Sequence, residues 1–569
     1  MHMQKQRSIL YFIAGIVFSI SCISVSGQLN SSSPLNTSGE HVEIFTDRSI
    51  YGVGEKIHFS TVCSKPEGIP AEWSKIMYAE LIRWNGAKIA SVKVPLVHGS
   101  GKGSLDVPAS LETGVYYLRA YTKWMRNFSP YDYSYLTLRV VNPISSRTER
   151  GPAEQGELRH FDSLEIQSPK GIVEFRNIKE LYGTREPVEM LMQAHDDYLP
   201  GTCNLSVVRT GSFDIQAASY RPGLVSSAQE EFKLEYYPEI RGLSLSGKLV
   251  NKETKEPVRQ SRVDLSSVSD AFYFASAKTG DDGSFLFTFP QTSGTHEFHL
   301  TNEGETNVSF LIDADFCKRP VSLPYIPFQM SEDERELIAD IVTNSQIEKN
   351  FMAAETNVYP EDSARLAFYG TPTRIIYEKD FIELVDLQEF LFELVYEVTV
   401  RERDGEKKIF FNGQSTLSSY PPLILLDNIP VRNIDELLKV GCRRIDRIEL
   451  LNAGYVMGYF LHSGIISIYS EGKDMAGMKQ GENSNFFSLD LFEYPEQGFP
   501  EYKGEHKLSR VPDLRSTLCW EPSLEIKKGE SKSIHFYTGD AKGEYTVYLS
   551  GIDSAGNRVV TKGPVFRVQ

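Results

Sequence analysis

Cysteine, positive charge and long apolar segments are all scarce in this 569-residue sequence. Six cysteines are too few and too widely spaced for a disulfide-stabilised scaffold. Beyond residue 27, no apolar run approaches the roughly 18 residues that a membrane-spanning helix needs. The 60 Lys and Arg against 76 Asp and Glu leave a net charge of −16. That balance disfavours binding to nucleic acid or to an anionic membrane surface.

Motifs of common enzyme and metal sites are also missing. The sequence has no Gly-x-Ser-x-Gly, His-Glu-x-x-His or P-loop motif, and no Cys-x-x-Cys pair. His296 and His299 are three residues apart on an expected strand, where alternation turns them to opposite faces and makes a shared metal difficult. Glu393 and Glu397 could pair as acid and base, but a solvated face explains them more simply. We therefore predict no catalytic residue, no cofactor and no metal, and a protein that is not an enzyme.

What the sequence does contain favours short strands. The 42 glycines and 28 prolines favour frequent turns, while the 32 phenylalanines and 29 tyrosines belong to residue types that are enriched in strands. Seven short strand-like runs within about 100 residues are typical of a β-sandwich. The predicted fold class is mainly β, with several sandwich domains in tandem and one α+β domain.

The N-terminal region is typical of an export signal. Lys5 and Arg7 precede an apolar run, and small residues follow it. We predict a signal peptide over 1–27, with cleavage after Gly27. Cleavage before Cys22, giving a lipid anchor there, and an uncleaved anchor helix remain alternatives.

The rest of the chain divides into a linker and six units. The helix is predicted from the capping box that Ser331 and Glu334 form. The linker is predicted at 28–40, sandwiches at 41–143, 160–240, 241–316 and 486–569, a bridging helix at 330–350 and the α+β domain at 352–475.

A motif near residue 50 resembles the opening of the MG2 domain of α2-macroglobulins. It reads Thr-Asp-Arg-x-x-Tyr-x-x-Gly-Glu, and its residues are Thr46, Asp47, Arg48, Tyr51, Gly54 and Glu55. A later strand with Gly114 and Tyr116 is similar to the same domain. We expect these residues to hold a hairpin corner, with Tyr51 capping the edge of the sandwich. The 160–240 unit is similar to the next macroglobulin-type domain.

The third sandwich resembles carboxypeptidase regulatory-like domains. The resemblance rests on a strand through Gly247 and a Gly-Asp-Asp-Gly turn that ends at Gly283. The resemblance implies a structural module without catalysis. The Asp pair in the turn could hint at calcium, but turn chemistry is the simpler interpretation.

Three segments of the α+β domain are similar to the plug domain of TonB-dependent receptors. Their marker residues are Asp427, Pro430, Val431, Ile448, Glu449, Gly464 and Ile466. Asn428 replaces the usual Gly of the turn, and Asn also tolerates positive φ.

Together these resemblances imply a bacterial cell-envelope protein, exported to the periplasm or associated with the outer membrane. We predict a non-enzymatic binding or scaffold protein for protein or glycan ligands, with a separate outer-membrane barrel protein as a further candidate partner. Two alternatives remain, an accessory component of TonB-dependent uptake and a protease inhibitor. No Cys-Gly-Glu-Gln thioester motif is present, so a covalent trap is excluded. The chain after residue 475 is too short for a roughly 22-stranded barrel.

Overall fold

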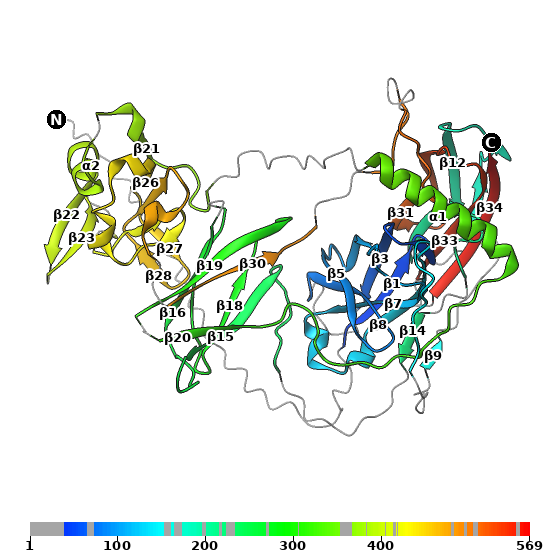
Figure 1. Cartoon of the computed structure of the whole chain (residues 1–569), viewed down its shortest axis with the longest axis horizontal. Coiled ribbons are helices and arrows are strands. Elements are labelled where there is room, and N and C mark those ends of the chain that lie inside the picture. The colour runs from blue at the N-terminus through cyan, green and yellow to red at the C-terminus, as the bar shows by residue number, and fades with distance from the viewer. Residues whose placement is uncertain are drawn as a thin grey trace, which may run out of the picture. The chain divides into compact units, whose positions relative to one another are not determined.

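The structure is a computed structural model of the whole chain. It describes residues 39–64, 73–152, 161–163, 173–195, 201–215, 219–222, 234–268, 272–304, 307–352, 367–382, 384–403, 405–412, 417, 419–479, 483–493, 498–503, 510–552 and 558–569. The predicted signal peptide, Cys22 and almost all of the 28–40 linker lie outside these residues. The described chain is mainly β, with three sandwiches and one α+β module, so the predicted fold class is confirmed (Figure 1).

The first sandwich is built from strands that follow one another in sequence. One sheet has the order β1-β3-β6 and the other contains β5-β4-β7-β8, with β2 pairing parallel to β8. The bounds are β1 His41–Thr46, β2 Ile50–Gly52, β3 Lys56–Ser64, β4 Ile76–Ile82, β5 Lys88–Pro95, β6 Ser100–Asp106, β7 Gly114–Thr122 and β8 Ser134–Val141. Short 3-10 turns at Trp124–Asn127 and Pro130–Asp132 join β7 to β8. Ile44 and Phe59 of one sheet and Tyr78 and Tyr116 of the other share one buried core.

The second sandwich combines two segments that are far apart in sequence. Its sheets have the orders β10-β12-β32 and β11-β34-β33-β13-β31. The bounds are β10 Val173–Arg176, β11 Leu181–Tyr182, β12 Pro187–Ala194, β13 Gly201–Arg209, β31 Thr517–Ile526, β32 Ser531–Tyr537, β33 Gly543–Ile552 and β34 Arg558–Val568. Figure 1 shows the late strands β31, β33 and β34, coloured orange to red, gathered with β12.

This arrangement corrects the prediction of separate sandwiches at 160–240 and 486–569. Strand β13 has β31 on one side and β33 on the other, so the two segments close one core. Two further strands of the 160–240 range, β9 (Phe161–Ser163) and β14 (Ser219–Pro222), extend the β8 edge of the first sandwich instead. Alternation predicts that a strand has a buried face, but it does not identify the partner strand.

The third sandwich also takes a strand from a distant segment. Its sheets have the orders β18-β15-β20 and β17-β16-β19-β30. The bounds are β15 Ser244–Asn251, β16 Arg262–Ser267, β17 Phe274–Lys278, β18 Ser284–Thr288, β19 Thr295–Glu303, β20 Val308–Ile312 and β30 Ser484–Asp490. The module is therefore 241–316 plus β30, most of which falls in the range predicted for the C-terminal sandwich, 486–569.

Helix α1 (Glu332–Met352) begins at the predicted capping box. The backbone N–H of Glu334 donates to Ser331 Oγ at 3.3 Å, and Glu334 Oε2 accepts from the Ser331 N–H at 2.9 Å. Ile338 and Val342 pack against Ile50 of the first sandwich. Asp340 pairs with Arg209 of the second sandwich at 2.8 Å. The helix thus touches both sandwiches.

The α+β module has a five-stranded sheet of order β21-β26-β29-β24-β25. Its strands are β21 Arg374–Tyr377, β24 Leu423–Leu426, β25 Ile429–Pro430, β26 Ile445–Leu451 and β29 Ile465–Ser470, with hairpins β22 Val398–Arg403 to β23 Glu406–Phe411 and β27 Tyr455–Met457 to β28 Phe460–His462. Helices α2 (Leu387–Leu394) and α3 (Ile434–Leu437) pack on it, and 3-10 turns lie at Glu378–Asp380, Cys442–Arg444 and Met475–Gly477.

In the part of the chain that the structure describes, no helix is both long and apolar enough to span a bilayer.

Candidate functional site

The MG2-type motif forms a closed corner between β1 and β2. Tyr51 donates its hydroxyl to Asp47 Oδ1 at 2.6 Å and lies 2.8 Å from the Arg48 carbonyl oxygen. Arg48 pairs with Glu55 at 3.0 Å, and its guanidinium carbon lies 4.5 Å from the Tyr51 ring centroid. Glu55 also accepts the Gly52 N–H at 2.5 Å. All of these side chains are buried or nearly so.

Burial and charge together set the protonation of this corner. Burial alone lowers the pKa of Arg48, but Glu55 and then Asp47 outweigh it and raise the pKa above its ordinary value. The pKa of Tyr51 is raised by burial and by the Asp47 carboxylate. The corner is therefore a fixed ion cluster whose polar atoms face one another. These contacts join β1 to the turn that leads into β3.

The same corner contacts the second sandwich. Asp47 Oδ2 accepts a hydrogen bond from Thr517 Oγ1 at 2.5 Å. Arg558, on β34, stacks over Phe45 at 4.4 Å and approaches the Ile44 carbonyl oxygen at 3.3 Å. These contacts of Thr517 and Arg558 could not be predicted from the sequence, because the two residues lie about 470 and 510 positions from their partners.

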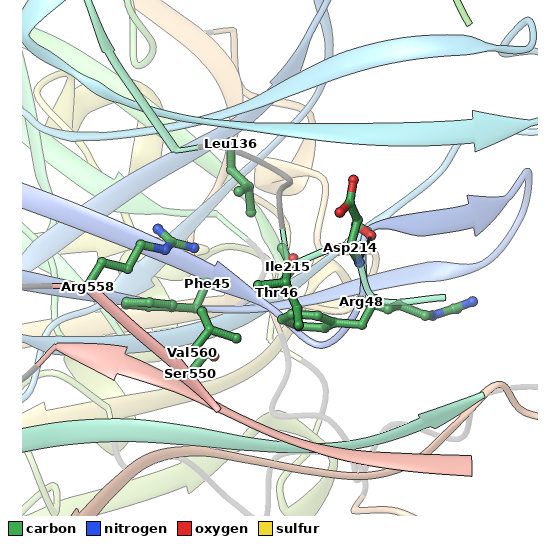
Figure 2. Close-up of a pocket in the computed structure, with 11 residues that line it drawn as sticks. Phe45, Thr46, Arg48, Leu136, Asp214, Ile215, Ser550, Arg558 and Val560 are labelled. Atoms are coloured by element: carbon green, nitrogen blue, oxygen red, sulfur yellow. Dashed lines mark hydrogen bonds between the residues drawn. The ribbon is translucent and has the colours of Figure 1, made fainter. Parts of the chain in front are cut away.

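A small pocket lies beside this contact. In Figure 2, Thr46 lies in the middle of the lining, with Arg558 and Phe45 on one side of it and Arg48 on the other. The volume open to solvent molecules inside it is about 20 Å³, enough for about one water molecule. Burial lowers the pKa of Arg558 to about 10, so the guanidinium stays protonated at neutral pH. The pocket can hold water but not a metabolite.

The remaining macroglobulin markers are also structural. Gly54 has φ +85° and donates its N–H to the Val107 carbonyl at 2.7 Å. A Cβ at Gly114 would lie 2.8 Å from Glu149 Cβ, so only glycine fits. Tyr116 is buried and donates to the Glu112 carbonyl at 2.7 Å.

The markers of the third sandwich have steric roles. A Cβ at Gly247 would lie 2.5 Å from the Leu311 oxygen. Gly283 has φ +76°, and its Cβ would lie 2.6 Å from the Leu249 oxygen. Asp282 pairs with Lys248 at 2.9 Å and accepts the Ser284 N–H at 3.1 Å, as a turn carboxylate does.

The turn between β24 and β25 is held by an aspartate. Asp427 and Asn428 have φ of +47° and +66°, so the turn geometry expected for an Asn substitution is present. Asp427 accepts from the Ser470 N–H at 2.7 Å, from Ser470 Oγ at 2.5 Å and from the Met475 N–H at 2.8 Å. After the turn, Pro430 pairs opposite Leu425, and Val431 donates its N–H to the Ile424 carbonyl.

The other plug markers lie in the same sheet. Ile448 and Ile466 are buried, and a Cβ at Gly464 would lie 2.4 Å from the Leu451 oxygen. Glu449 accepts from Tyr369 Oη at 2.7 Å and from Arg447 Nε at 2.8 Å. All of these marker residues are buried except Val431, which is partly buried.

The two pairs considered for metal binding or acid–base catalysis, His296 with His299 and Glu393 with Glu397, make contacts with other residues. His296 lies 2.9 Å from the Ser293 oxygen, whereas His299 packs on Phe486 at 4.5 Å. Glu397 pairs with Arg374 at 2.7 Å, and Glu393 is exposed. Among the described residues, no group of three His, Cys, Asp or Glu could hold a metal ion.

Sequence reasoning missed two features. The first is a polar junction between the third sandwich and the α+β module, where Asp264 accepts from Arg262 at 2.7 Å and from Arg432 at 2.5 Å. His299 is buried beside it, neither ring nitrogen has a described hydrogen-bond partner, and burial lowers its pKa to about 4. The second is a set of exposed apolar residues around α2. Its residues are Ile382, Val385, Phe392 and Tyr396. Apolar spacing in the sequence does not reveal which of the two phenylalanines of α2, Phe390 or Phe392, faces out.

The comparisons with known proteins find only remote structural likeness. No family model matches the chain, and no curated protein matches it. A Salmonella α2-macroglobulin mutant is 8% identical, with a TM-score of 0.22, over 93% of this chain and 39% of that one. The native E. coli α2-macroglobulin is 9% identical, with a TM-score of 0.23, over 94% and 40%. A tandem repeat of a large adhesion protein is 10% identical, with a TM-score of 0.13. The chain spans about two fifths of the length of the macroglobulins.

Proposed function

We propose that this chain is an exported, non-enzymatic protein of the bacterial cell envelope that binds other proteins or glycans. The observation that carries the proposal is the contrast between its polar groups and its apolar ones. The motif carboxylates and cations face each other in buried clusters, while large apolar side chains of the plug-type module face solvent. Exposed apolar groups that gather on one module are typical of interaction sites.

The macroglobulin-like nature of the first sandwich rests on its motif and topology. The corner of Asp47, Arg48, Tyr51 and Glu55 lies where a three-stranded sheet meets a larger one. Sandwiches of this kind bind through edges and loops, with a rigid core behind them. A binding role needs no reactive group, which agrees with the water-sized pocket at the corner.

Site-specific photo-crosslinking in intact cells tests the proposal. A benzophenone side chain is placed at position 392, on the exposed face of α2, and in a separate variant at position 286, where Leu286 of the third sandwich is also exposed. We expect a defined crosslinked product in the envelope fraction from at least one site. Turnover of a substrate by the purified chain, or a cytosolic location, would contradict the proposal.

A second candidate is an accessory role in TonB-dependent uptake. The observation that favours it is the plug-type sheet with its Asp427-Asn428 turn. In that case the product from position 392 would contain an outer-membrane barrel protein, and a deletion strain would grow poorly on one defined nutrient. Stable complexes with a panel of purified proteases would point to the inhibitor alternative instead.

A further inference from the structure

Large apolar side chains are exposed on α2 and on the chain just before and just after it. Phe392 is 82% exposed and Tyr396 is 76% exposed, and just before the helix Ile382 and Val385 are 89% and 80% exposed. We call these four residues the α2 face. In a folded domain such side chains are usually buried, so a cluster of four within 15 residues is unusual.

The local structure fixes this orientation. Asp386 caps the helix by accepting the Glu389 N–H at 2.9 Å. Leu387, Phe390 and Leu391 are buried in the core of the module, which turns Phe392 outward. The Arg374 guanidinium lies 4.8 Å from the Tyr396 ring centroid and also pairs with Glu397. The Tyr396 ring is therefore held in place by its neighbours.

The segment that carries the α2 face is rich in carboxylates, and two cations from neighbouring strands contact it, Arg374 at Glu397 and Lys407 at Gln388. Residues 378–397 contain seven Asp or Glu and one Lys, a net charge of 1 − 7 = −6 out of −16 for the whole chain. On the exposed side of the helix, Glu389 and Glu393 flank Phe392. A partner that covered the face with acidic or uncharged groups would leave these carboxylates desolvated or opposed by like charge.

We propose that the α2 face binds a basic segment of a partner protein, with Lys or Arg beside aliphatic or aromatic anchors. The anchors would cover Phe392 and Tyr396, and the cations would meet Glu389 and Glu393. The inference rests on the proposed binding role and specifies the chemistry of one partner. Charge of the opposite sign is the reason to choose this occupant over a second copy of the acidic chain or an anionic lipid surface.

The module provides a matched control surface. In the β27–β28 hairpin, Val456 and Tyr459 are also exposed, with Tyr459 at 83%. Residues 452–463 contain no Asp, Glu, Lys or Arg. The two surfaces thus resemble each other in apolar exposure and differ in charge.

The test measures binding of two synthetic peptides to the full chain by fluorescence anisotropy. One is a 14-residue helix of Leu and Lys, and the other has Glu in place of each Lys. We expect the Leu/Lys peptide to bind and the Leu/Glu peptide not to bind. The double variant Phe392→Ser/Tyr396→Ser should weaken binding at least tenfold, as loss of central aromatic anchors does. Glu393→Gln should weaken it less and reduce its dependence on salt.

The control variant Val456→Ser/Tyr459→Ser should bind the peptide like the unaltered chain. Unchanged thermal unfolding of each variant shows that it is folded. Equal affinity of the α2 and control variants, or binding of both peptides, would overturn the inference. So would concentration-dependent dimerisation of the chain through the α2 face. If the inference fails while a crosslink forms at position 286, the proposed binding role stands; if no site forms a crosslink, that role fails as well.

Discussion

The first and second sandwiches have similar sheets, but the strands of the first follow one another in sequence whereas those of the second come from two distant segments. Strands β1 to β8 of the first lie within about 100 consecutive residues. The second is closed only when β31 and β33 flank β13, so that Thr202 pairs with Ile552. The comparison teaches that local motifs specify how a sandwich corner is built, whereas its partner strands can come from anywhere in the chain.

The largest expected effect comes from truncation after residue 512, which removes β31 to β34. Strands β10 to β13 then lose most of their core, so we expect the second sandwich to unfold while the first stays folded. Hydrogen exchange should show amides of 187–209 unprotected and those of 114–141 protected. Adding residues 510–569 as a separate chain should restore protection. Persistent protection of 187–209 in the truncated chain would refute the shared core.

Arg48→Met should be the most damaging single substitution in the first sandwich. It leaves the Asp47 and Glu55 carboxylates without their buried cation, which costs about 3–5 kcal/mol of unfolding free energy. Urea denaturation followed by tyrosine fluorescence measures the loss. The control is Arg176→Met in the second sandwich, whose solvent-exposed pair with Glu174 should contribute little to stability. Equal losses for the two variants would show that the corner is not special.

His299 should make the third sandwich less stable in mild acid. Its pKa is lowered to about 4 by burial, so the folded state binds its proton less readily than the unfolded state, where the pKa is near 6.5. Its contribution is therefore complete above pH 6.5 and is lost progressively as the pH falls towards 4, by up to roughly 3 kcal/mol. Asp264, with Arg262 and Arg432, faces the same junction.

Unfolding midpoints measured from pH 7 to pH 4 test this. We expect His299→Gln to remove most of the slope that is attributed to the histidine. The exposed His535, on β32, supplies the control, since His535→Gln should leave the slope as it was. An unchanged slope in the His299 variant would contradict the prediction.

The smallest effect is expected where the two sandwiches meet. Thr517→Val removes the donor to Asp47 while Tyr51 still serves the other carboxylate oxygen. A loss of about 1–2 kcal/mol is expected, because a buried acceptor loses one partner. Differential scanning calorimetry should measure this loss of stability. The control is Ser533→Ala, a surface change that should cost less than about 0.5 kcal/mol. If the two changes have equal effects, the link between the sandwiches contributes nothing measurable.

The predictable part of this fold was local. The corner from Thr46 to Glu55 spans ten residues, and the turn at Asp427 has its own signal, so both could be predicted from the sequence. Helix α1 was predicted from its capping box.

The unpredictable part depended on distant pairing. Apolar and polar residues alternate only weakly in the sequence of β30. The residues near Ser484 do not indicate that this strand pairs with β19. The exposed α2 face could not be predicted either, because it depends on how the rest of the module packs against the helix. In the run from Leu387 to Leu394, only the surrounding core shows that Phe390 is buried and Phe392 is not. The periodicity of apolar residues indicates which face of a helix is apolar, but it does not show which other elements pack against that face.

The split of the second sandwich has a consequence for how the chain matures. Strand β13 ends at Arg209 and its neighbour β31 begins at Thr517, a gap of 517 − 209 = 308 residues. At roughly 5–20 residues per second of synthesis, about 15–60 s pass between the two. During that interval both edges of β13 are open templates for a wrong strand. A newly made chain therefore needs either a holding chaperone or delayed collapse until its last strands arrive.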